Sequence, residues 1–429
     1  MVLSSVAIGF TAGFVPNVQA DQLSARPLDV GSAVQIAIQD NPGLAEVRSR
    51  YAALSEVPSQ VGTLPDPIVM FGAMNFPTDT FDRTQEPMTQ LQIGFSQTFP
   101  FPGKLNLKAL AAEHDATAAG HSAEEANLQL VRKVKNQWWQ IYYIDRALQT
   151  VEKNEVLLEQ LIEVAATKYE TGKGLQQDVL LAQLELSKLI DKKIQLEAVR
   201  RQQGIQLNIL MDRSPAREVV LREQIDRSMP KLADESELFN KAEIARPLLH
   251  RLKSKLDAAR TRLDSAKRDY LPDFTVGLTY GNRTGVNPQP RAGSRSDFLS
   301  AIIGIRVPIY AGRKQSKAVT QRNLDVQTSQ YALLDERGLV HGAISSTITD
   351  YKRAKQQLSL FESGIVPQAE QTVQSMLAGY QVSEVDFLNL VRSQMALLNF
   401  ELQYWKAFAE AKQALAQLEA AVGEEAIYE

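Results

Sequence analysis

The sequence predicts an α+β membrane protein that is internally duplicated, with long helices and four β-strands in each chain. Three observations support this fold class. The 18 prolines avoid residues 104–214 and, except for Pro367, residues 309–429, which indicates two helical blocks because proline disrupts helix interiors. Four short segments alternate apolar with polar or small residues, as strands do. Ordered matches between the two halves of the chain indicate a tandem duplication.

The overall composition excludes several classes of function. Lys and Arg number 47 against 50 Asp and Glu, a formal net charge of −3, and a nucleic-acid partner would need a basic excess. The absence of Cys excludes disulfides, thiolate metal sites, thiol nucleophiles and a lipid-modified N-terminal Cys. A hydrophobic share of 44% and a charged share of 23% are those of a folded chain.

Residues 1–20 are expected to be a signal peptide. They are apolar and rich in small residues up to Val15, and Val18-Gln19-Ala20 has the form of a cleavage site. No Lys or Arg precedes the apolar stretch, and an N-terminal core helix is the alternative interpretation. Cleavage after Ala20 would deliver the chain to the periplasm or outer membrane of a Gram-negative bacterium.

The first repeat, 21–220, contains two strands at about 67–76 and 88–99, followed by a long helical hairpin at 104–211. The hairpin has apolar residues at steps of three, four or seven, the spacing of helices that pack along a narrow seam. These residues are Val131, Val134, Trp138, Ile141, Leu148, Val151, Leu158, Ile162 and Ala165. One helix over 104–169 would be roughly 100 Å long, too long for one compact domain, so it needs neighbours from other subunits.

The second repeat, 221–429, has the same layout, with strands at about 274–281 and 298–309 and a helical hairpin at 314–423. Its seam residues are Ile344, Ile348, Tyr351, Leu358 and Ile365. At a constant shift of 211, four residues of the first hairpin match four of the second: Tyr169, Gln183, Gln206 and Leu207 match Tyr380, Gln394, Gln417 and Leu418. The two hairpins are therefore expected to be equivalent.

The four strands have the length and alternation of strands that cross a membrane. Each is about ten residues long, which spans a bilayer when tilted. A small polar face that includes Gln90, Gln92, Ser96, Thr275 and Thr279 would suit a water-filled lumen. The loops 77–87 and 282–296 are long and polar, as extracellular loops are. An ordinary sheet packed on helices is the alternative interpretation.

Four strands cannot close a barrel by themselves. An open sheet edge in lipid leaves backbone groups without hydrogen-bond partners, at a cost of several kcal/mol each. If these strands lie in a membrane, several chains must share one barrel. The sequence therefore predicts an oligomer in which a shared barrel continues into a long helical tube.

Several short motifs resemble the TolC-like outer-membrane efflux channels over nearly the whole chain after residue 29. In the first half they are NPGL at 41–44, LPDP at 64–67 and QTFPFPGK at 97–104. In the second half they are LPDF at 271–274 and VPIYAGRK at 307–314, and the two hairpins add YETGKGLQQDVLLAQ at 169–183 and YQVSEVDFLNLVRSQ at 380–394. LPDP, NFP and FPFPGK look most like the heavy-metal branch, which serves exporters of metal cations.

The resemblance implies a homotrimer in the bacterial outer membrane, in contact with its lipid. Three chains would form a 12-stranded transmembrane β-barrel continuous with a 12-helix periplasmic tube. The far end of the tube would dock on an inner-membrane efflux pump, of the RND type, and on a periplasmic adaptor, or membrane fusion protein. The channel itself would be passive, without a cofactor, and would not bind nucleic acid.

The hairpin tips are the candidate periplasmic entrance. Gly172 and Gly174 lie where the first long helix must reverse, and Gly tolerates the positive φ that such a turn requires. The segment 380–389 would form the second tip. The entrance candidates are Gly172, Gly174, Asp178, Glu384, Asp386, Asn389 and Arg392. In the family the second tip often carries Gly and Asp where this chain has Ser383 and Arg392, which puts cation selectivity in doubt.

No catalytic or metal-binding motif is present. The sequence lacks G-x-G-x-x-G, P-loop, H-E-x-x-H and G-x-S-x-G patterns, so an enzyme is not expected. His114 and His121 are seven residues apart and could share a helix face, but no third ligand shares their spacing. The methionines Met70, Met74 and Met88 are interpreted as packing residues rather than soft-metal ligands.

Two classes of function remain open from the sequence. The first is an outer-membrane channel of a tripartite efflux system, for heavy-metal cations, with multidrug efflux or type I secretion as alternative cargoes. The second is a soluble periplasmic coiled-coil adaptor. Detergent dependence would separate them, because a channel stays with the outer membrane after carbonate washing whereas an adaptor is released.

Overall fold

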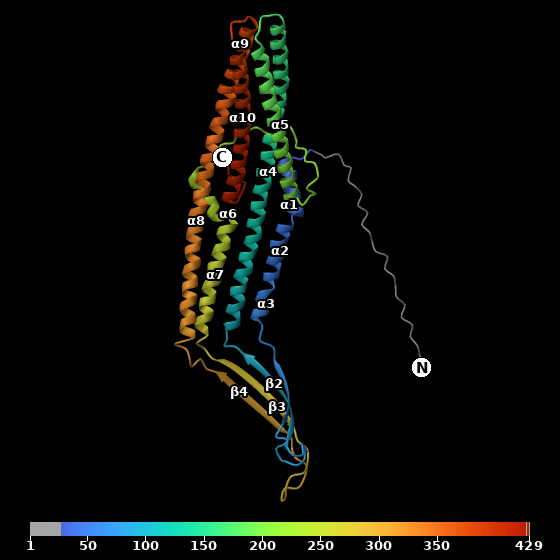
Figure 1. Ribbon diagram of the computed structural model, residues 1–429. Coiled ribbons are helices and arrows are strands. Elements are labelled where there is room, and N and C mark those ends of the chain that lie inside the picture. The colour runs from blue at the N-terminus through green and yellow to red at the C-terminus, as the bar shows by residue number, and fades with distance from the viewer. Residues whose placement is uncertain (1–26, 426, 429) are drawn as a thin grey trace, which may run out of the picture.

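The computed structural model describes residues 27–425 and 427–428. The expected signal peptide, 1–20, lies outside the described residues. The chain is elongated, with a bundle of long helices at one end and a four-stranded sheet at the other (Figure 1). Within the described residues, no helix is both long and apolar enough to cross a membrane.

The helices of the two long hairpins lie in the blocks that the prolines delimit, and the other helices lie outside these blocks. In the first half they are α1 (Val30–Asp40), α2 (Pro42–Ser55), α3 (Val57–Gly62), α4 (Lys104–Glu170) and α5 (Gln176–Leu210). In the second half they are α6 (Glu235–Ala245), α7 (Pro247–Arg268), α8 (Gln315–Leu360), η1 (Phe361–Ile365), α9 (Val366–Gln381) and α10 (Phe387–Val422). The predicted single helix over 104–169 is confirmed, since α4 has 67 residues.

The apolar seams of the two hairpins form the core of the bundle. Six of the nine seam residues predicted on α4 are buried, namely Val134, Trp138, Ile141, Val151, Leu158 and Ala165. Four of the five predicted on the second hairpin are buried as well: Ile344, Ile348, Tyr351 and Leu358. One part of the core is aromatic, and Trp138 stacks on Tyr142 with ring centroids 5.6 Å apart. The indole N–H of Trp138 donates to the carbonyl of Leu28 at 3.0 Å.

The second hairpin differs from the first at one turn of π-helix. The segment η1 separates α8 from α9, directly before Pro367. Proline has no N–H to donate, and in an α-helix its ring would clash with the carbonyl four residues earlier. At the widened turn the N–H of Val366 donates to the carbonyl of Phe361, five residues back. The extra residue in the turn therefore accommodates Pro367 without ending the helix.

The strands form one antiparallel sheet in the order β1-β2-β3-β4. They are β1 (Ile68–Met74), β2 (Gln90–Phe99), β3 (Asp273–Asn282) and β4 (Phe298–Arg306). The strands expected at 67–76, 88–99 and 298–309 are shorter than predicted, because the residues beyond their ends have no partner strand. The strand expected at 274–281 is one residue longer at each end.

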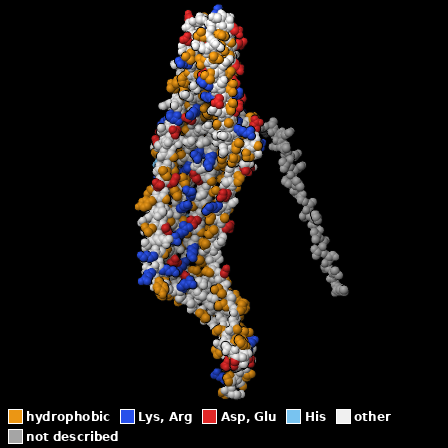
Figure 2. Space-filling model, viewed as in Figure 1, with side chains coloured by type: hydrophobic (Ala, Val, Ile, Leu, Met, Phe, Trp, Pro, Cys, Tyr) orange, Lys and Arg blue, Asp and Glu red, His pale blue; other side chains and the backbone are white. Residues whose placement is uncertain are grey.

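The register gives the sheet one apolar face and one small, polar face. Phe71 pairs with Ile93, which pairs with Tyr280, which pairs with Leu299 across the four strands. Phe71 and Leu299 are 80% and 76% exposed, so nothing in the described part of the chain covers them. The opposite face carries Gln90, Gln92, Gly94, Ser96, Thr275, Thr279, Ser300 and Gly304, interrupted by Ile68, Met70, Met74, Phe298 and Ile302. Figure 2 shows Lys and Arg gathered over the helices rather than the sheet.

The FPFPGK and LPDF motifs form the joint between the sheet and the helices. Lys104, at the start of α4, is buried and donates to the carboxylate of Asp273 and to the carbonyl of Leu271, both at 2.8 Å. Gly103 has a φ of +87°, and a Cβ there would lie 2.7 Å from the guanidinium of Arg268. Only glycine fits this corner, which explains why Gly precedes Lys in the motif.

Candidate entrance at the helical tips

Two short turns lie at the end of the bundle farthest from the sheet. One turn, 171–175, joins α4 to α5, and the other, 382–386, joins α9 to α10. They lie together at the top of the view in Figure 1. All seven predicted entrance residues belong to these turns or to the first two turns of α5 and α10.

The first turn ends α4 with a left-handed residue. Gly172 has a φ of +71°, as predicted, and a Cβ there would meet nothing within 4 Å. Its N–H donates to the carbonyl of Tyr169 at 3.0 Å, and the N–H of Lys173 donates to the carbonyl of Lys168 at 2.8 Å. These two bonds form the Schellman motif, which satisfies carbonyls at a helix end.

The second turn repeats this motif at the shift of 211. Ser383 takes the place of Gly172, with a φ of +64°. Its N–H donates to the carbonyl of Tyr380 at 3.1 Å, and the N–H of Glu384 donates to the carbonyl of Gly379 at 2.9 Å. A left-handed conformation is costly for a residue with a Cβ. Ser383 therefore holds a strained position, which the first turn fills with Gly172.

The prediction that the turn requires a positive φ at Gly174 is wrong. Gly174 does not have a positive φ, so the turn does not need its backbone freedom. A Cβ there would instead lie 2.9 Å from the Cβ of Lys168 and 3.1 Å from its carbonyl carbon. Glycine is needed at position 174 because the turn passes close to the end of α4. Any larger residue would push Lys168 aside.

Lys168 joins the two tips and was not found by sequence reasoning. Its ammonium donates to the carbonyl of Tyr380, near the end of α9, and to the Ser383 hydroxyl at 3.2 Å. It also lies 4.3 Å from the centroid of the Tyr380 ring. A cation at a helix C-terminus is stabilised by the free carbonyls there. No signal in the sequence pairs two residues that lie 212 positions apart.

Asp178 and Asp386 lie near each other across the two tips. Partial burial raises the pKa of Asp178, and the charge of Asp386 raises it further, while a backbone hydrogen bond at Leu175 and the charge of Lys168 lower it. Burial, and then the charge of Asp178, raise the pKa of Tyr380. The Tyr380 hydroxyl is buried and has no hydrogen-bond partner in the described part of the chain. The two tips therefore carry two neighbouring carboxylates and a buried tyrosine hydroxyl close to Lys168.

The remaining candidates lie on the outside of the second tip. Glu384, Asn389 and Arg392 are exposed, and no hydrogen bond or ion pair of their side chains is found among the described residues. The structure thus places Asp178 near Asp386 and Lys168, and leaves Glu384 and Arg392 facing solvent in the single chain. Among the described residues, no group of three or more His, Asp or Glu side chains is arranged to hold a metal ion.

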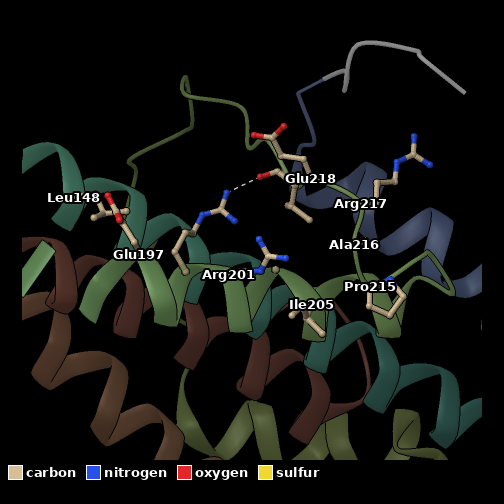
Figure 3. Close-up of a pocket in the computed structure, with 11 residues that line it drawn as sticks. Leu148, Glu197, Arg201, Ile205, Pro215, Ala216, Arg217 and Glu218 are labelled. Atoms are coloured by element: carbon tan, nitrogen blue, oxygen red, sulfur yellow. Dashed lines mark hydrogen bonds between the residues drawn. The ribbon is translucent and has the colours of Figure 1, made fainter. Parts of the chain in front are cut away.

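A groove of 660 Å³ lies halfway along the bundle, between α5 and the linker 211–221 (Figure 3). Arg201 points from α5 toward the linker that carries Pro215 and Glu218. Arg200 is held by Asp145 on α4 at 2.5 Å and by the carbonyl of Val219 at 2.5 Å. Its guanidinium therefore fastens the linker to the hairpin, and the groove is a structural feature of the body rather than an entrance.

Solved structures share this architecture over most of its length. The outer-membrane channel OprN is 16% identical with a TM-score of 0.78, covering 92% of this chain and 89% of its own. CusC, described as forming a transmembrane channel, is 14% identical with a TM-score of 0.77, covering 92% of each chain. The MtrE channel of Neisseria gonorrhoeae is 14% identical with a TM-score of 0.76, covering 92% of this chain and 89% of its own. The fold is that of an outer-membrane channel.

The sequence itself establishes the family. A profile described as outer membrane efflux protein matches residues 33–211 and 238–424. No functionally curated protein matches the chain. The chain belongs to the outer membrane efflux protein family, and it is accordingly an outer-membrane channel component and not an enzyme. This membership argues against the soluble adaptor.

Proposed function

We propose that three copies of this chain form one passive efflux channel, in which a shared 12-stranded barrel continues into a helical tube. The observation that carries the proposal is the open sheet. Its outer strands, β1 and β4, each have a partner on one side only. Lipid offers no hydrogen bonds to a free edge, so β1 of one copy pairs with β4 of the next until the barrel closes.

The helices support the same arrangement. Along the tip half of the bundle, α4 packs between α5 and α10, and α10 packs on α9, which leaves α5 and α9 at the edges. The outward face of α5 is apolar, and Leu180, Leu184 and Ile194 are each more than half exposed. On α8, Tyr331 and Leu339 are similarly exposed. Neighbouring copies in a closed ring would cover these surfaces, which is the favourable contribution that the single chain lacks.

The tips are the end of the tube that meets the pump. The channel binds no cofactor and takes its energy from an inner-membrane pump of the RND type, joined to it by a periplasmic adaptor. The exposed Glu384 and Arg392 on the second tip are the charges available to that contact. The repeat units 21–220 and 221–429 each supply one tip, so a trimer presents six.

The cargo that we propose is heavy-metal cations. The support is the resemblance of LPDP, NFP and FPFPGK to the metal-exporting branch. The lumen would be lined by the small, polar face of the sheet, where Gln90, Gln92, Thr275 and Thr279 offer neutral oxygens and amides to hydrated ions. Such a lining also admits amphiphilic drugs or unfolded protein, so selectivity resides mainly in the pump.

Deletion of the chain tests this cargo. We expect the deleted strain to become more sensitive to zinc, cobalt, cadmium, copper or silver, while its sensitivity to a dye and a macrolide changes little. Reintroduction of the full chain is the control and restores resistance. Sensitivity to the drugs alone would leave the channel in place and contradict the metal cargo.

A further inference from the structure

Two histidines from different repeats meet on the wall of the bundle. His121 lies on α4 and His250 on α7, and their ring centroids are 5.4 Å apart at an interplanar angle of 35°. The spacing of His114 and His121 had pointed to a pair on one helix. The structure instead places His121 against a residue 129 positions away.

The hydrogen bonds of the two rings determine which nitrogens carry protons. Nδ1 of His121 lies 2.9 Å from a carboxylate oxygen of Glu124, and Nε2 of His250 lies 2.6 Å from the carbonyl oxygen of Ile244. An ionised carboxylate and a carbonyl can only accept, so both of these ring nitrogens must donate. Each neutral ring therefore keeps one unprotonated nitrogen: Nε2 of His121 and Nδ1 of His250.

Hydrogen bonds of this kind accompany the histidines of protein metal sites. A metal-binding His donates its other N–H to a carboxylate or a backbone carbonyl, which fixes the ring and increases its basicity. With metal–nitrogen bonds of about 2.0 Å, two imidazoles on one ion have their centroids roughly 5 to 6.5 Å apart. The observed 5.4 Å lies in that range.

The pair is also accessible. A groove of 310 Å³ lies between α2, α3 and α4. Its lining includes Tyr51, Pro58, Glu113, His121 and Glu124. The side chain of His121 is 26% exposed. A hydrated ion can therefore reach the ring of His121 through this groove, and His250 is partly exposed as well.

We propose that His121 and His250 form a two-nitrogen site for a divalent late transition-metal ion, with water in the remaining positions. Imidazole nitrogen favours Cu²⁺, Ni²⁺ and Zn²⁺, and Cu²⁺ binds most tightly in this series. The described residues provide no third His, Asp or Glu ligand, so the site is open and of modest affinity. A bound ion would fasten α4 of the first repeat to α7 of the second, and this role is independent of the cargo.

Copper binding to the purified full chain, without a histidine tag, tests the proposal. Cu²⁺ is titrated by calorimetry, and its electron paramagnetic resonance spectrum is recorded at one equivalent per chain. We expect splitting from two nitrogens. His121→Ala and His250→Ala should each remove one nitrogen from the spectrum and weaken binding at least tenfold. Glu124→Gln should weaken binding less, since it changes only the partner of His121.

His114→Ala and His341→Ala are the matched controls, because His114 lies on the same helix and His341 stacks on Phe239 away from the pair. Both should bind Cu²⁺ like the wild type. The proposal is overturned if His121→Ala and His250→Ala keep the wild-type affinity and spectrum, or if the controls lose as much.

Discussion

Lys168 is the residue that determines how the two tips are held together. A single ammonium group contacts the Tyr380 carbonyl, the Tyr380 ring and the Ser383 hydroxyl. Gly174 leaves the space that this side chain needs. The contacts between the two tips therefore depend on the charge of Lys168 and on the absence of a side chain at Gly174.

Replacement of Lys168 by Met should loosen the second tip. The loss of a charged hydrogen bond at a helix end corresponds to roughly 1 to 2 kcal/mol of local opening free energy. We expect faster amide hydrogen exchange across 380–386, measured by mass spectrometry on the detergent-solubilised protein. Lys173→Met, in the adjoining turn and exposed, is the control and should exchange like the wild type. Equal exchange in both variants would contradict the role of Lys168.

Asp178 should make the tip more stable as the pH falls. Its pKa is raised in the fold above the ordinary 3.8, mainly by burial and then by Asp386. Asp178 therefore binds a proton more tightly in the folded tip than in the unfolded chain. The free energy of unfolding of the tip falls as the pH rises from the ordinary pKa of Asp178 through its raised pKa. Amide protection of 171–178, corrected for intrinsic exchange rates, should rise between pH 7 and pH 4 in the wild type. Asp178→Asn should remove this dependence, and identical profiles for both proteins would contradict it.

At the scale of elements, the outer strands of the sheet are where neighbouring copies should meet. The chain has no cysteine, so introduced pairs report only their own contacts. Met70→Cys on β1, combined in turn with Ser300→Cys, Ile302→Cys or Gly304→Cys on β4, should give an oxidised ladder that stops at three chains. Gly94→Cys with Thr279→Cys is the control, because these residues are paired within one sheet and should link only inside a chain. If none of the three β4 positions gives disulfide-linked dimers and trimers, the shared barrel is contradicted.

The regular elements could be predicted from the sequence because each depends on local patterns. Proline spacing located the long helices, and alternation located the strands to within three residues at their ends. Contacts between distant residues left no such pattern. Lys168 with Tyr380 and His121 with His250 became neighbours only once the repeats packed together. Gly174 looked like a turn glycine, but its requirement comes from the packing of Lys168 and not from its own backbone.

At the scale of the whole molecule, one chain leaves two kinds of surface unsatisfied. The apolar face of the sheet is open, and both of its edge strands lack a second partner. The apolar residues on the outward faces of α5 and α8 are also exposed in the single chain. Lipid can cover the sheet face, but only another copy can satisfy the sheet edges. The proposed shared barrel is therefore supported by the backbone as well as by the side chains.

The mass of the assembled protein tests this account most directly. Native mass spectrometry of the protein released from detergent micelles should show a single species of three chains, because three four-stranded sheets close one barrel. Circular dichroism on the same sample should show both helix and strand. A homogeneous monomer that keeps its strand signal would contradict the shared barrel, since four strands would then be stable in detergent with both edges open.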